Sequence, residues 1–343
     1  MYFYVMSKIS LITIIFCVGF FFGKNTVSSQ NITTNKLNTL IQPPYLKAGD
    51  TVAIVAPSGV LKNRTEEVNK AKELLKSWGL HVVVGKHVFR QANHFAGTDD
   101  ERCEDLQKAM DDPNINAIWC ARGGYGTVRI LDKLNYAKFR KNPKWLIGYS
   151  DITALHNQIH NEGFETIHGM MCTSLQDEQD TIKETIETFK NALFGNPMAY
   201  TLKGTNYNKI GATKGELVGG NLAILASMLG SKTSIDTSGK ILFIEEIGEY
   251  EYSIDRMLQS LKRAGYFENC VGVIVGDISK IRKNTTAWGS PVQQLILDVL
   301  ADYNFPVAFN MPAGHEKDNR ALILGRTVEM KVDKNQSSIV FKN

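Results

Sequence analysis

The chain has 343 residues, of which 43% are hydrophobic and 22% are charged, a composition typical of a globular protein with a buried core. Its length favours about two domains of ~150 residues each. The 39 basic and 35 acidic residues leave a net charge of +4. Because the basic residues are spread among the acids rather than clustered, we expect no nucleic-acid partner.

The first 29 residues differ from the rest of the chain. Lys8 precedes an apolar stretch from Ile9 to Phe22, and a segment of polar and small residues follows it. That order predicts a signal peptide over residues 1–29 and cleavage before Gln30. The apolar stretch is short for a bilayer span of ~20 residues, but if retained it would anchor the chain. We therefore expect an exported, periplasmic protein, or one that contacts the membrane only through this uncleaved segment.

Residues 45–172 alternate between strand and helix patterns. Short apolar runs at 51–55, 80–85, 115–121 and 144–148 predict buried strands. Helical segments are expected between them, at 65–79, 97–110 and 127–134, and again in the 150s; Thr98 and Glu101 form a predicted capping box. This alternation predicts a parallel sheet with helices on both faces, which binds ligands at the carboxyl ends of its strands. Three such ends carry distinctive loops: "APSG" (56–59), "ARGGYG" (121–126) and "GYSD" (148–151).

The pattern changes in the second half of the chain. Residues 173–212 are expected to form a helical connection, and residues 213–343 a second, strand-rich domain with one clear helix at 253–265. Its strands are expected at 240–246, 270–278, 306–314, 321–332 and 337–342. Cys103, Cys120, Cys172 and Cys270 have neither CxxC nor metal-ligand spacing, so we expect buried free thiols, although an exported chain could oxidise two of them.

Ser150 stands between an expected strand and an expected helix, in "WLIGYSDITALH". A serine in that position is usually an N-cap for the helix. It can also be a nucleophile, since a helix N-terminus stabilises a developing oxyanion. The sequence lacks the second glycine of the Gly-x-Ser-x-Gly elbow, so the α/β-hydrolase family is not indicated.

A serine nucleophile needs a base and an acid to orient that base. His156 and His160 are spaced like the histidines of HExxH but lack its glutamate, so no zinc site is predicted. His168 follows an expected strand and fits packing or the site equally well. His315, in "MPAGHEKDNR", occupies a loop from which it could face a cleft.

Two further patterns bear on this chemistry. An apolar run leads directly into Glu245 and Glu246, and buried carboxylates need partners; an ion pair with Arg256 or another cation is the alternative to a catalytic role. The glycines of "ARGGYG" lack the rest of a P-loop or a dinucleotide fingerprint. They suit a backbone that approaches a substrate, where an N–H paired with the amide after Ser150 would form an oxyanion hole.

Taken together, the motifs resemble the LD-carboxypeptidase family of serine peptidases, which includes murein tetrapeptide carboxypeptidases and microcin-immunity peptidases. The similar segments are "VAIVAPSG", "FAGTDDERCEDLQKAMDDPNINAIWCARGGYGTVRIL", "LIGYSDITALH", "IHGMM", "GELVGGNLAIL", "LFIEEIGEYEYSIDRML" and "MPAGHEKDNRALILG". They follow one another in family order over about residues 45 to 330.

The resemblance implies a flavodoxin-like N-terminal domain and a smaller β-rich C-terminal domain, with the site between them. It implies a catalytic triad of Ser150, Glu245 and His315, and an oxyanion hole formed by backbone amides near Gly124 and Asp151. It further implies a homodimer, with no metal and no cofactor. Arg122 and Arg320 are our candidates for binding the carboxylate of the substrate.

The implied activity is release of terminal D-alanine from murein tetrapeptides at an L-to-D bond. Hydrolysis of a peptidyl-nucleotide antibiotic by the same residues is an alternative, and Trp288 is a weak candidate for stacking a nucleobase. A peptidoglycan-binding module without activity is a third hypothesis, which the full set of triad residues disfavours.

Overall fold

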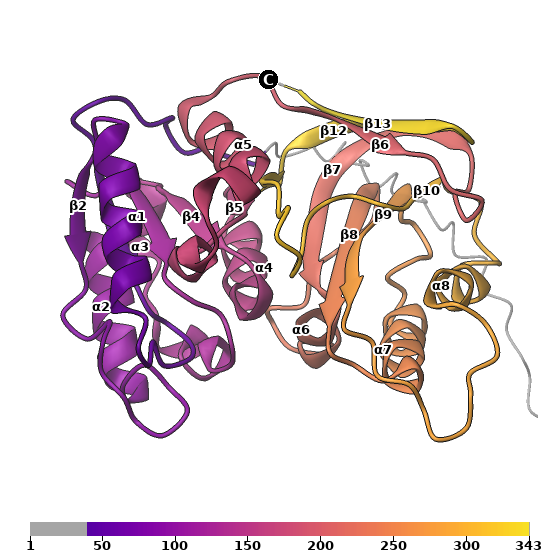
Figure 1. The fold of residues 1–343 in the computed structure, drawn as a ribbon, viewed down its shortest axis with the longest axis horizontal. Coiled ribbons are helices and arrows are strands. Elements are labelled where there is room, and N and C mark those ends of the chain that lie inside the picture. The colour runs from indigo at the N-terminus through magenta and orange to yellow at the C-terminus, as the bar shows by residue number, and fades with distance from the viewer. Residues whose placement is uncertain (1–39, 343) are drawn as a thin grey trace, which may run out of the picture. The chain divides into compact units, whose positions relative to one another are not determined.

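The computed structural model describes residues 40–342, so the predicted signal peptide lies outside the described residues. Two sheets dominate this part of the chain (Figure 1). The first has six strands: β1 (Thr51–Val55), β2 (His81–Val84), β3 (Ala117–Cys120), β4 (Trp145–Gly148), β5 (Thr166–His168) and β11 (Leu322–Leu324). No helix within residues 40–342 is long and apolar enough to cross a membrane.

The first sheet has the order β11-β5-β4-β3-β1-β2, in which β1 to β5 are parallel and β11 is antiparallel. Helix α1 (Thr65–Ser77) packs with Val52 and Ile54 on one face. On the other face α2 (Asp99–Asp111), α3 (Ala137–Lys141) and α4 (Thr153–Asn161) pack with Ala53 and Val55. Successive residues of β1 therefore serve opposite faces, and the predicted parallel sheet with helices on both faces is confirmed.

The second sheet is mixed and has the order β10-β9-β8-β7-β12-β13-β6. Strands β7 to β10 are parallel, whereas β12, β13 and β6 are antiparallel to their neighbours. The bounds are β6 (Ala199–Lys203), β7 (Gly211–Asn221), β8 (Lys240–Ile247), β9 (Gly272–Ser279), β10 (Val307–Ala308), β12 (Thr327–Val332) and β13 (Gln336–Phe341). The predicted strand-rich second half is thereby confirmed.

Of the local features expected from the sequence, some were predicted correctly and others were not. Thr98 and Glu101 form the predicted capping box at the start of α2. Residues 127–134 are two single 3₁₀ turns, η1 (Thr127–Arg129) and η2 (Leu131–Lys133), rather than a helix. The segment 173–212 contains α5 (Lys183–Phe194) and also strand β6.

The second half holds two helices beside the expected one, α7 (Glu251–Arg263). Helix α6 (Leu222–Ser227) is short, but α8 (Val292–Val299) buries Val292, Leu295, Ile296 and Val299. That spacing is helical and was visible in the sequence. The four cysteines beyond the N-terminal segment are free thiols, as expected, and three of them are buried.

The chain returns to the first sheet near its end, and this crossing positions the site. The expected strand at 321–332 is divided, so that β11 pairs with β5 while β12 pairs with β7. A buried ion pair holds the turn between them: the Arg326 guanidinium donates to both carboxylate oxygens of Glu165, at 2.7 and 2.6 Å. The loop from β10 to β11, which carries His315, therefore runs from the second sheet to the first.

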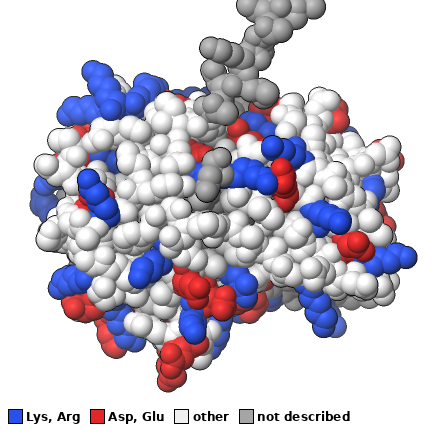
Figure 2. All heavy atoms as spheres, turned by 90° about the horizontal axis from the view of Figure 1, so that it is seen from above, with Lys and Arg blue, Asp and Glu red and all other residues white. Residues whose placement is uncertain are grey.

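Charges are mixed on the surface. On the face shown in Figure 2, lysines and arginines are spread widely and acidic side chains lie among them. That distribution agrees with the small net charge of the sequence.

Candidate active site

Ser150 lies where β4 ends, in a 3₁₀ turn (η3, Ser150–Ile152) that leads into α4. Its φ of 63° is left-handed, a conformation that costs roughly 1–2 kcal/mol for a residue with a Cβ. Neither η3 nor α4 has a side-chain cap, so Ser150 is not the N-cap of either. A strained serine at a strand-to-helix turn is the arrangement that exposes a nucleophile.

The glycine-rich loop after β3 comes directly against this serine. A Cβ on Gly123 would lie 3.0 Å from the Ser150 Cβ and 3.3 Å from its Oγ. Glycine is therefore required for the close approach of the two loops. Gly124, the next residue, has a φ of 105°, in the region that glycine tolerates. The backbone amides of Gly124 and Asp151 thus belong to loops that meet at Ser150, and their role as an oxyanion hole stays a prediction.

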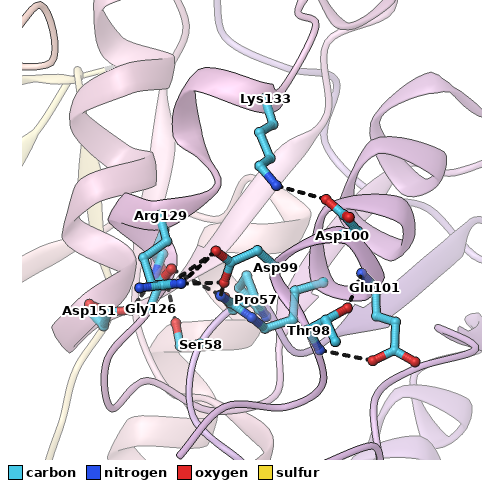
Figure 3. Close-up of polar contacts among 12 residues, drawn as sticks. Pro57, Ser58, Thr98, Asp99, Asp100, Glu101, Gly126, Arg129, Lys133 and Asp151 are labelled. Carbon is cyan, nitrogen blue, oxygen red and sulfur yellow. Dashed lines mark hydrogen bonds and ion pairs between the residues drawn. The ribbon is translucent and has the colours of Figure 1, made fainter. Parts of the chain in front are cut away.

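Buried polar contacts fix the loops at the carboxyl end of the first sheet (Figure 3). The Asp151 carboxylate accepts a hydrogen bond from the Thr127 amide at 2.9 Å, and the Ser58 and Thr127 hydroxyl oxygens are 2.6 Å apart. The buried guanidinium of Arg102 donates to the carbonyls of Pro57 and Gly126. These contacts join "APSG", "ARGGYG" and "GYSD" into one rigid structure. The sequence analysis missed Arg102, because nothing in a helical pattern marks an arginine that turns inward.

Glu245 and His315 form the most direct contact of the site. Glu245 is fully buried on β8, and its Oε2 lies 2.7 Å from Nδ1 of His315. Burial lowers the pKa of His315, but the hydrogen bond and the negative charge of Glu245 outweigh burial, so that the pKa is raised above its ordinary value. The contact leaves Nε2 of the imidazole available to the cavity that His315 lines. Such a carboxylate orients an imidazole as a base.

The Glu246 carboxylate contacts backbone amides and not His315. It accepts hydrogen bonds from the backbone amides of Ala223 at 2.7 Å and Ile247 at 2.8 Å, so it binds the first turn of α6. Burial, together with the charge of Glu245, raises the pKa of Glu246 to about 7, although the hydrogen bonds from Ile247 and Ala223 act to lower it. Arg256 makes no ion pair with either glutamate among the residues that the structure describes; the group that Glu245 pairs with is His315, which is a cation when protonated.

Tyr149 is the chain neighbour of the serine and packs against the histidine. It precedes Ser150, and its ring centroid lies 5.0 Å from that of His315 in an edge-to-face arrangement. On its other side lies the buried ring of His168, at 5.9 Å. Burial, aided by the charge of Glu245, raises the pKa of Tyr149 to about 12. Tyr149 therefore packs on the imidazole of His315 as a neutral ring, and His168, whose pKa burial lowers well below its ordinary value, supports Tyr149 as a second neutral ring.

The two histidines of α4, His156 and His160, are structural residues. His156 bonds the Gly148 carbonyl at 2.9 Å, and burial lowers its pKa to about 4. His160 contacts Lys240 and Glu216 in the second half of the chain. Within residues 40–342 no group of three histidine, cysteine, aspartate or glutamate side chains is placed to hold a metal ion.

A cavity of about 390 Å³ adjoins His315 and Tyr149. The remaining residues around it are Arg64, Arg122, Thr173, Ser174, Gln176, Asp177, Ile182, Lys280, Glu316, Lys317 and Asn319. Of the two predicted carboxylate ligands, Arg122 lines this cavity. Arg320 does not, and its guanidinium is paired with Asp318 at 2.9 Å. Arg64 and Lys280 were missed by the sequence analysis.

Arg122 is half-buried and has no acidic partner in the described part of the chain. Its guanidinium donates to the Val60 carbonyl. Burial and then the neighbouring charge of Arg64 lower its pKa, because both disfavour the protonated form. An anionic group of a substrate would provide the acidic partner.

A parallel sheet covered by helices on both faces, a serine where a central strand ends, and a carboxylate bonded to a histidine that lines a cavity are features found in hydrolases. Comparison with known proteins identifies the family. Residues 52–169 match the LD-carboxypeptidase N-terminal domain, and residues 214–330 match the LD-carboxypeptidase C-terminal domain. The chain belongs to the LD-carboxypeptidase family.

Individual relatives agree with this assignment. The chain is 35% identical over 292 residues to a probable murein peptide carboxypeptidase of Bacillus subtilis, covering 84% of this chain and 91% of the relative. The crystal structure of muramoyltetrapeptide carboxypeptidase from Oxalobacter formigenes has a TM-score of 0.77 at 27% identity, covering 85% of this chain and 99% of that one. The microcin C7 self-immunity protein MccF shares the fold at 24% identity, with a TM-score of 0.78, covering 89% of this chain and 99% of that one.

Proposed function

We propose that this protein is a serine carboxypeptidase that hydrolyses an L-to-D peptide bond and releases terminal D-alanine from murein tetrapeptides. The observation that carries the proposal is the Glu245–His315 contact, against which packs the ring of Tyr149, the residue next to the strained Ser150. The relative from Oxalobacter formigenes is a carboxypeptidase for muramoyltetrapeptide, which supplies the substrate class.

In the proposed reaction, Ser150 Oγ attacks the carbonyl carbon before the terminal D-residue while Nε2 of His315 takes its proton. The amides of Gly124 and Asp151 stabilise the oxyanion of the tetrahedral intermediate. His315 then donates the proton to the leaving amine, and D-alanine departs. Water, deprotonated by His315, attacks the remaining ester, and the proton returns to Ser150. Each step uses residues of this chain, the substrate and one water molecule.

Arg122 would bind the terminal carboxylate of the substrate. It adjoins Gly123, which approaches Ser150 closely, and its half-buried guanidinium donates to a backbone carbonyl rather than to an acid. A carboxylate held there would place the last peptide bond, rather than an internal one, at the serine. This arrangement accounts for cleavage of a single terminal residue.

The deciding experiment incubates the purified protein with a murein tetrapeptide and, separately, with a peptidyl-adenylate mimic, and follows both by mass spectrometry. Release of D-alanine that is abolished in Ser150→Ala and unaffected by EDTA supports the proposal. Cleavage of the adenylate mimic alone would favour the microcin-immunity alternative. Binding of the tetrapeptide without cleavage by the wild-type protein would show a peptidoglycan-binding module instead.

A further inference from the structure

Three exposed aromatic rings gather at one place outside the catalytic cavity. Tyr250 and Tyr252 lie at the start of α7, with their rings stacked at 5.6 Å and 22°. Trp288 lies in the loop that follows β9. These three, here called the aromatic shelf, are 37%, 47% and 37% exposed and account for three of the eight large hydrophobic side chains exposed in the described part. Such clustering on a surface marks a binding site.

The shelf is held in place by its own contacts. Tyr250 pairs with Arg282 as a parallel bridge, and the Arg282 amide donates to the Glu249 carbonyl at 2.8 Å. The Arg282 guanidinium lies 5.7 Å from the centre of the Tyr250 ring, and that of Arg256 lies 5.4 Å from the Tyr252 ring. These cation–π contacts and backbone bonds support the two tyrosine rings of the shelf.

The shelf borders a hollow of about 690 Å³ whose other lining residues are neutral: Asn284, Thr285, Thr286 and Ala287. Its surfaces are therefore aromatic faces, hydroxyl groups and one amide. A pyranose ring matches this combination, because its C–H face packs on an aromatic ring while its hydroxyl and N-acetyl groups bond to hydroxyls and amides. A strongly apolar ligand would leave these hydroxyl and amide groups unpartnered.

The shelf also lies within reach of the catalytic cavity. Lys280 lines that cavity, and Arg282, two residues further on, is at most ~7 Å away along the chain. Tyr250 pairs with Arg282 and adds ~5 Å, the spacing of neighbouring strands. The three residues that separate the terminal bond of a muramoyltetrapeptide from its sugar span ~10 Å when extended. A peptide whose upstream residues lie beside Lys280 in the cavity could thus place its sugar on the shelf.

We propose that the aromatic shelf binds the N-acetylated amino-sugar ring of a murein fragment whose peptide occupies the catalytic cavity. This inference rests on the proposed function and sharpens it, because it makes sugar-bearing muropeptides, rather than free tetrapeptides, the preferred substrates. The shelf would act on the affinity for the substrate and leave the chemical step unchanged.

The test compares kcat and KM for N-acetylmuramoyl-tetrapeptide and for the same tetrapeptide without sugar. We expect the wild-type KM to be about tenfold lower for the sugar-bearing substrate, as stacking on two rings implies. Trp288→Ala and Tyr252→Ala should each reduce that preference severalfold without changing kcat or the KM for the free tetrapeptide. Phe89→Ala removes an aromatic ring that is 49% exposed elsewhere and should change nothing.

The possible results separate this inference from the proposed function. Equal KM values for the two substrates in an active wild-type enzyme would overturn the inference alone. If neither substrate is hydrolysed, the shelf can still be tested by binding. Ser150→Ala protein is titrated with N-acetylmuramoyl-tetrapeptide while the fluorescence of Trp288 is followed. No change in fluorescence, or a change equal to that given by the free tetrapeptide, overturns the inference. A Trp288→Ala protein that loses dimers in light scattering but keeps the sugar preference would make the shelf an interface between copies, and the inference would be wrong.

Discussion

Glu245 Oε2 and His315 Nδ1 are 2.7 Å apart although seventy residues separate them. The neighbouring Glu246 carboxylate binds the amides of Ala223 and Ile247 instead. Successive side chains of a strand point to opposite faces, so the two acids of β8 cannot share one partner. This geometry supports Glu245 as the acid of the proposed triad, and it makes the two glutamates a matched pair for mutation.

Glu245→Ala should lower kcat by a large factor, on the order of 10³-fold, though less than Ser150→Ala. The carboxylate orients the imidazole and stabilises its charged form, whereas the serine forms the covalent bond. Glu246→Ala should act mainly on stability, since Glu246 binds the start of α6. Steady-state kinetics and circular dichroism of both variants test this. A greater loss of turnover in folded Glu246→Ala would place the triad acid one residue further along.

The pH dependence should follow the raised pKa of His315. As a general base His315 must be neutral, so kcat/KM should fall as the pH drops through that raised pKa. Glu245→Gln removes the hydrogen-bonded charge that favours the protonated form, and the acid limb of the profile should move to lower pH. Asp277→Asn, which removes a weaker and more distant charge, should move it less in the same direction. An acid limb that stays in place in Glu245→Gln would show that His315 does not control it.

The left-handed backbone at Ser150 predicts a difference between two inactive variants. Ser150→Ala keeps a Cβ at a φ of 63°, whereas Ser150→Gly removes that strain. We expect Ser150→Gly to be more stable than Ser150→Ala by about 1 kcal/mol, because relief of strain exceeds the added entropy of the unfolded chain. Urea denaturation of the two proteins measures the difference. A more stable alanine variant would mean that the turn is not strained.

Arg122 should determine that the substrate ends in a free carboxylate. The wild-type enzyme is expected to hydrolyse a tetrapeptide with terminal D-alanine at least tenfold better, in kcat/KM, than one with terminal D-alaninamide, since a charged hydrogen bond contributes ~1.5–3 kcal/mol. Arg122→Gln should lose this discrimination. Arg320→Gln is the control, because Arg320 is paired with Asp318 and does not line the cavity. Unchanged discrimination in Arg122→Gln would assign the carboxylate to another cation.

We also propose that the protein is exported and that its mature chain begins near Gln30. N-terminal sequencing of the protein from periplasm and membranes tests this. Full-length chain in the cytosol would contradict export, and full-length chain in the membrane would show that residues 1–29 act as an anchor.

Much of the fold could be predicted because its signals are local. Apolar runs of four or five residues bounded by glycine and proline predicted β1, β3 and β4, and the Thr98–Glu101 spacing predicted the start of α2. The division of 321–332 between two sheets was not predictable from the same kind of pattern. Both pieces are apolar, and only the partner strand decides which sheet each one joins.

The sequence by itself placed Ser150 after a strand, His315 in a loop and two adjacent acids at a strand end. It also provided the motif series by which the family could be recognised. Only the tertiary structure decided which acid reaches the histidine, which arginine lines the cavity, and that Arg102 turns inward to hold three loops. It alone brought Tyr250 and Trp288 together. The physical reason is that motifs report the backbone a residue needs, whereas contacts between residues tens of positions apart depend on the path of the whole chain and on which face of each strand is buried.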